Sequence, residues 1–95
     1  MKAKFKFTGA YIEEQVVGGP GEGLTAVLDV DVIYDDGQIF KCSAKIKQTV
    51  GSDYKDKIIE VGSIEGLPSD RKYDYHQFAE AARQFYTTRV VRKGS

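Results

Sequence analysis

Lysines at alternating positions are the residues of this chain that most resemble a functional surface. On β-strands such lysines share one face, and six of them could form a basic plate: Lys2, Lys4, Lys6, Lys41, Lys45 and Lys47. A second basic zone lies near the C-terminus and comprises Arg83, Arg89, Arg92 and Lys93. Basic side chains neutralise phosphates, so this surface is a candidate nucleic-acid interface. Its predicted contacts are Lys4, Lys6, Lys41, Lys45, Lys47, Arg89 and Arg92.

The same face carries features that argue against nucleic acid. Asp29 and Asp31 alternate like the lysines, which favours a solvated face balanced by aspartates. The sequence also predicts no exposed aromatic residues there, although readers of single strands stack bases on such residues. Nucleic-acid binding is therefore the alternative hypothesis, and a steep loss of affinity with salt would identify it.

Metal and cofactor chemistry find little support. Asp29 and Asp31 lie roughly 7 Å apart on one strand face, but the spacing from Asp29 to Gly37 does not match an EF-hand loop. One histidine, His76, and one cysteine, Cys42, are too few ligands for a conventional zinc site. The glycine-rich stretch 17–23 lacks the following helix and lysine of a phosphate loop and is interpreted as a connector. No metal ligands and no cofactor-binding residues are predicted.

Catalytic groups are equally scarce. Cys42 falls on an apolar strand face and is interpreted as a buried hydrophobic residue. His76 is expected on the surface of a helix, beside Glu80 one turn later. The serines have no plausible base, and Glu13 and Glu14 lie in a segment without a predicted element. No catalytic residues are predicted.

Residues 24–48 alternate between apolar and polar types through a turn, which predicts a β-hairpin. A two-residue loop at Asp36–Gly37 would set apolar Val32 against Lys41. A three-residue loop, with Gly37 at positive φ, instead pairs Tyr34 with Gln38 and matches every face. The predicted pairs are Val32–Phe40, Val30–Cys42, Leu28–Ala44, Ala26–Ile46, Asp31–Lys41 and Ile33–Ile39.

Three further elements follow from the pattern. Residues 2–7 predict a first strand beside the second, with its lysines facing Asp29 and Asp31, and residues 57–61 predict a fourth strand. Residues 62–72 predict an irregular connection. From Asp74, an N-cap with Gln77 able to complete a capping box, an apolar stripe predicts a helix. The β-branched residues 87–91 leave open whether the helix continues or a short strand follows.

The 95 residues, at zero net charge, predict a single α+β domain spanning 1–95. The expected architecture is a four-stranded antiparallel meander with one C-terminal helix packed on its apolar face. Phe78, Ala82 and Phe85 are expected to meet Val30, Val32 and Phe40. A cytoplasmic location is expected, because no apolar run follows the basic N-terminus and none is long enough to cross a membrane.

One helix is about 10–12 Å wide and a four-stranded sheet about 19 Å, so part of the apolar face needs another cover. The sheet could curl, residues 62–72 could roof it, or a second copy could bury it. We expect a small intracellular protein-binding or assembly module without catalytic activity, self-associating as a homodimer.

Overall fold

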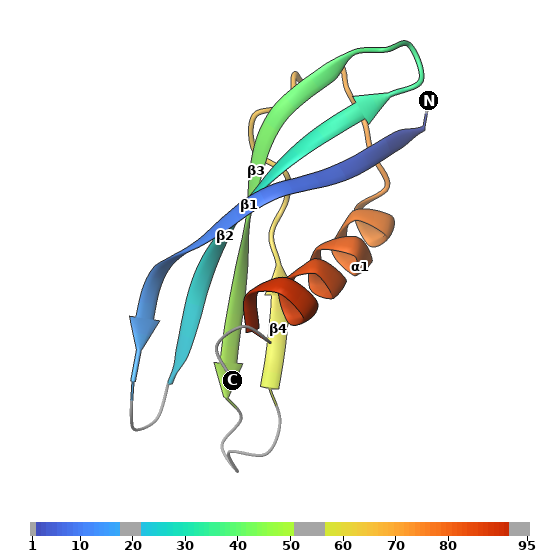
Figure 1. Cartoon of the computed structure of the whole chain (residues 1–95). Coiled ribbons are helices and arrows are strands. Elements are labelled where there is room, and N and C mark those ends of the chain that lie inside the picture. Colours follow the sequence, from blue (N-terminus) through green and yellow to red (C-terminus); the bar gives the residue numbers. More distant parts are fainter. Residues whose placement is uncertain (1, 18–21, 51–56, 92–95) are drawn as a thin grey trace.

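A computed structural model describes residues 2–17, 22–50 and 57–91, so Arg92, Lys93 and most of the predicted glycine-rich connector lie outside the described residues. Four strands, β1 (Ala3–Val16), β2 (Gly23–Tyr34), β3 (Ile39–Val50) and β4 (Lys57–Val61), pair antiparallel in chain order. Helix α1 (Tyr75–Phe85) lies across one face of this twisted sheet (Figure 1). The predicted α+β meander is confirmed. Within the described ranges, neither helical segment has the length and hydropathy needed to span a membrane.

The β2–β3 hairpin has the predicted three-residue loop. The N–H of Tyr34 donates to the carbonyl of Gln38 over 2.9 Å, and Gly37 takes a φ of 88°. An Asp36 carboxylate oxygen accepts from the Gln38 N–H and closes the turn locally. All six predicted cross-strand pairs are confirmed, from Ile33–Ile39 to Ala26–Ile46. The even positions of β2 and β3 therefore face inward, toward the helix.

Strand β1 has 14 residues, more than twice the length predicted, and contains two irregularities. The register against β2 shifts between Phe7 and Gly9 and again between Ile12 and Glu14. Each extra residue, Thr8 and Glu13, exchanges the faces of the residues that follow. Lys6 precedes both extra residues and lies opposite Asp31, as predicted. Beyond the first extra residue, Gly9, and no lysine, lies opposite Asp29.

Helix α1 packs its apolar stripe on the inner face of the sheet. The Asp74 carboxylate caps its first turn by accepting from the Gln77 N–H over 3.1 Å, as predicted. Phe78 and Ala82 are fully buried, and the Phe78 ring lies 5.1 Å from the Phe5 ring. Phe85 is only half-buried and stacks on Phe7 of β1 at 4.9 Å between ring centroids.

The segment between β4 and α1 covers the hairpin end of the inner face. Its Arg71 guanidinium lies 5.0 Å from the Tyr34 ring centroid and 5.2 Å from that of Phe40. The Tyr34 hydroxyl also donates to the carbonyl of Lys72. The prediction that the helix covers Phe40 is therefore corrected: Arg71 covers this ring, and of the three proposed covers, residues 62–72 supply one.

Beyond Phe85 the chain stays helical as a π-helical segment, Tyr86–Val91, rather than forming a strand. The N–H of Tyr86 reaches the carbonyls of both Ala82 and Arg83. The Thr87 hydroxyl donates to the Arg83 carbonyl, and the Thr88 hydroxyl to that of Gln84. The two threonine side chains thus add hydrogen bonds to carbonyls of the preceding turn.

Candidate functional site

The predicted basic plate lies on the outer face of the sheet, opposite the helix. Lys4, Lys6, Lys41, Lys45 and Lys47 are all exposed there, on β1 and β3. Asp31 of β2 lies between Lys6 and Lys41 in one cross-strand row. Lys45 is in an ion pair with Glu13, at 3.4 Å between Nζ and Oε2. Four of the five lysines therefore lie beside a carboxylate, because Lys47 lies opposite Glu60 of β4, whereas Lys4 lies opposite Ile33.

The outer face has no basic excess among the described residues. The five lysines named above, with Lys2 exposed just before β1, are matched by six carboxylates, those of Glu13, Glu14, Asp29, Asp31, Glu60 and Glu65. Arg89 does not join them, because it lies beside Phe7 and Phe85 on the helical side. One expectation about this face is wrong: the extra residue at Thr8 turns Tyr11 outward, and Tyr11 is 56% exposed. A single aromatic ring offers one stacking position, not a platform for successive bases.

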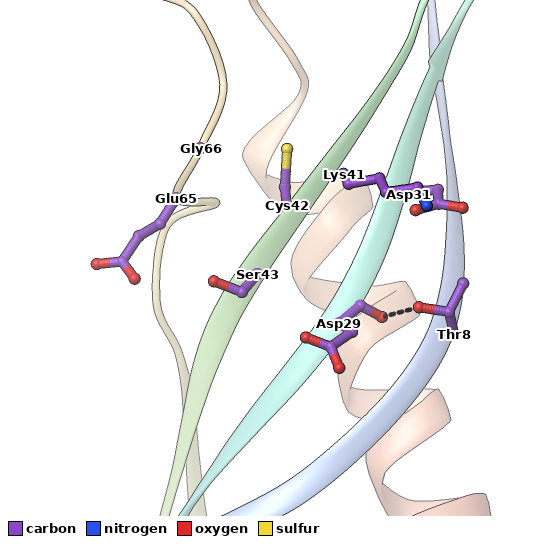
Figure 2. A pocket seen from close by; sticks show the side chains of 8 residues that line it. All are labelled: Thr8, Asp29, Asp31, Lys41, Cys42, Ser43, Glu65 and Gly66. Carbon is purple, nitrogen blue, oxygen red and sulfur yellow. Dashed lines mark hydrogen bonds between the residues drawn. The ribbon is translucent and has the colours of Figure 1, made fainter.

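An open depression of about 650 Å³ occupies the middle of this face (Figure 2). It is lined by Thr8, Asp29, Asp31, Lys41, Cys42, Ser43, Glu65 and Gly66. The Thr8 hydroxyl donates to the Asp29 carbonyl over 3.4 Å. Across the described ranges, no three His, Cys, Asp or Glu side chains come close enough together to hold a metal ion.

The Cys42 thiol and the His76 imidazole do not lie in surroundings that would activate them for catalysis. Cys42 is buried, and burial raises the pKa of its thiol, with Asp31 raising it further. Its Sγ donates weakly to the Phe40 carbonyl. A thiol with a raised pKa is a poor nucleophile at neutral pH. His76 is exposed in the first turn of α1, with its ring 5.9 Å from that of Tyr75.

The free edge of β1 is the surface that the sequence did not predict. Within the described sheet, β1 has a neighbour on one side only, namely β2. In its second half Tyr11 and Val16 are 56% and 45% exposed on the outer side, and Ile12 is 51% exposed on the inner side. Unpaired backbone groups and exposed apolar side chains therefore occur together along this edge.

A groove of about 700 Å³ runs beside this edge on the helical side. Phe7, Ala10 and Ile12 form its strand wall, and Phe85 and Arg89 lie on its helical wall. A signal for this site was present in the sequence. A second strand predicted to run from Leu24 to Tyr34 needs a first strand longer than residues 2–7 to pair along its whole length.

Comparisons with protein-family models, with curated proteins and with solved structures each found no match.

Proposed function

We propose that this chain is a protein-binding module, without catalytic activity, that associates through the free edge of β1. The observation that carries the proposal is the coincidence of an unpaired edge with the exposed apolar side chains of Tyr11, Ile12 and Val16. A partner strand added to such an edge gains main-chain hydrogen bonds and covers side chains on both faces.

The rest of the apolar surface supports this location. The inward-facing residues of the two central strands are already buried within one chain, from Ala26 to Val32 on β2 and from Cys42 to Ile46 on β3. No partner is needed to cover the middle of the sheet. Among the described residues, exposed large apolar side chains gather in the second half of β1, beside the groove, whereas β3 and β4 expose one each, Ile39 and Ile58.

The charge distribution favours a protein over a nucleic acid as the partner. A nucleic-acid surface needs a continuous positive field, whereas the lysines here alternate with carboxylates and the whole chain has zero net charge. The buried, unactivated thiol of Cys42 supports the absence of covalent catalysis at this residue. A single reduced cysteine is also in keeping with our proposal that the protein is cytoplasmic.

Site-specific photo-crosslinking in the producing cell tests the proposal. A crosslinking amino acid at Tyr11 should give discrete protein adducts that survive nuclease treatment. The matched control is the same amino acid at Ile39, which is 57% exposed on β3 and lies away from the edge. Adducts from Ile39 but not from Tyr11, adducts with nucleic acid, or no adducts at all would overturn the proposal.

A further inference from the structure

We propose, resting on this function, that the partner at the β1 edge is a second copy of the chain, paired antiparallel about Ala10. Two copies would then form one continuous eight-stranded sheet, with both helices on the same side. The inference depends on the charge order along β1, on the hydrogen-bonding direction of its residues, and on the groove beside it.

The charge order of β1 is complementary to itself when the strand is reversed. Its first half carries Lys4 and Lys6, and its second half carries Glu13 and Glu14. All four side chains are exposed. An antiparallel copy places the basic half of one strand beside the acidic half of the other, whereas a parallel copy would place like charges together. The edge therefore selects an antiparallel copy of itself.

The backbone presents the right residues to the free edge. The N–H of Tyr34 bonds to β3, so that alternate residues of β2, namely Ile33 and Asp31, bond to β1. Their partners on β1, Lys4 and Lys6, direct their backbone N–H and carbonyl groups toward β2. Gly9 and Tyr11 do the same after the first extra residue. Ala10, between the last two, directs its N–H and carbonyl to the free edge, where an Ala10–Ala10 pair can exchange both hydrogen bonds.

Charge selects the register about Ala10, which keeps the faces matched except where Phe7 lies opposite Glu13, the second extra residue of β1. This register sets Lys6 opposite Glu14 and Gly9 opposite Tyr11, and the members of each pair point to the same outer face. A centre at Gly9 would set outward Lys6 against inward Ile12, which loses both ion pairs, and inward Phe7 against outward Tyr11. A centre at Tyr11 keeps the faces matched but sets Lys6 against Val16, which loses both ion pairs.

The groove accommodates the remaining apolar side chain. In the Ala10 register, Ile12 of the second copy lies opposite Thr8 and points to the helical side. There the groove of about 700 Å³ is lined by Phe7, Ala10 and Phe85. Each copy thus inserts its half-exposed Ile12 beside the other copy's aromatic rings, and the arrangement repeats by two-fold symmetry.

Charge-swap variants of the full chain, followed by sedimentation equilibrium at micromolar concentration, test the pairing. The parent should be a dimer. Lys6→Glu and Glu14→Lys should each raise the dimer dissociation constant by roughly tenfold, because each creates two like-charge contacts. The double variant should regain the parent's affinity, and an equimolar mixture of the two single variants should form heterodimers. Lys47→Glu, an equal charge change on β3, should leave the constant unchanged.

A second pair of variants keeps the test decisive if a charge swap disturbs folding, which circular dichroism would reveal. Ile12→Lys should abolish the dimer, and Ile39→Lys, at a site of similar exposure, should not. A monomeric parent would overturn the second copy as partner, while protein adducts from Tyr11 would still support the proposed function. If neither Ile12→Lys nor the charge swaps change the dimer dissociation constant, the interface lies elsewhere and the inference is also overturned.

Discussion

Tyr86 and Gln48 form a buried polar pair that ties the end of the helix to the sheet. The Tyr86 hydroxyl donates to Oε1 of Gln48 over 2.6 Å, and burial raises the pKa of Tyr86. Tyr86→Phe removes the donor and leaves the buried amide oxygen unsatisfied. We expect a loss of about 1–3 kcal/mol in the free energy of unfolding, measured by urea denaturation.

A double variant provides the control for this pair. Tyr86→Phe combined with Gln48→Met removes both polar groups at similar volume and should recover part of the loss. Strictly additive losses would show that the hydrogen bond does not couple these residues.

Gly37 illustrates a cost that comes from the backbone alone. Its φ is 88°, and a Cβ added there would meet no atom within 4 Å. Gly37→Val should therefore destabilise the protein by about 1–3 kcal/mol through strain at positive φ, without any clash. Gly37→Asn should lower the stability clearly less, because asparagine tolerates positive φ. Thermal denaturation of the parent and of both variants measures the difference. Equal losses for Val and Asn would contradict this explanation.

At the scale of elements, the helix and the sheet meet through aromatic side chains of unequal burial. Phe78 is fully buried and touches three aromatic rings, those of Phe5, Phe7 and Tyr73. Phe78→Ala should cost about 3–5 kcal/mol by chemical denaturation. Phe85→Ala should cost less, because this ring is only half-buried on Phe7. Exposed Gln84→Ala should stay within about 0.5 kcal/mol. The reverse order of the two phenylalanines would contradict the packing described.

The connection between β4 and α1 is tied to the hairpin turn by a charged contact. Arg71 Nη1 lies 3.0 Å from Asp36 Oδ2, and the Gln38 N–H together with Arg71 lowers the pKa of Asp36 from its ordinary value of 3.8. Because the folded state favours the carboxylate, its stabilisation is full above pH 3.8 and is lost as pH falls through the lower folded pKa.

Asp36→Asn tests this contact, since asparagine still accepts from Gln38 but carries no charge for Arg71. Thermal denaturation should show the parent to be more stable than the variant at neutral pH. The difference should shrink as pH falls below about 4. A difference that stays constant down to about pH 2 would contradict the assigned role of the charge.

The pairing of β2 with β3 was predictable residue by residue, whereas that of β1 with β2 was not, because the strands differ in how fully they are buried. Every position from Leu24 to Ile46 on the inner face is buried or half-buried, so any slip of one residue would expose the whole apolar set. β1 pairs on one side only, where an extra residue costs little, and Thr8 and Glu13 break its period of two. The candidate interface at Tyr11 and Ile12 escaped prediction because it lies between these two breaks.

At the scale of the whole molecule, closure of the inner face was harder to predict. It depends on where α1 and residues 62–72 come to lie, and no local periodicity encodes that arrangement. Antiparallel bridging of Glu65 to Ser43 keeps the connection beside β3 before Arg71 crosses over Phe40. Self-association, which the sequence led us to expect from an uncovered sheet face, is therefore still a proposal. It now rests on the β1 edge instead.

Charge balance across the outer face leads to the last prediction, which concerns nucleic acid. Asp31 lies between Lys6 of β1 and Lys41 of β3, and Asp29 lies on the same outer face, between Gly9 and Ser43. Repulsion of phosphates by the two aspartates offsets the attraction of the lysines, so fluorescence anisotropy should show no binding of DNA or RNA oligonucleotides tighter than about 10⁻⁴ M at physiological salt. Replacing Asp29 and Asp31 with Asn and Glu65 with Gln removes three negative charges from the face and should create measurable binding that falls steeply with added salt. Tight, salt-sensitive binding by the parent would instead make nucleic acid the partner and leave the β1 edge without its assigned role.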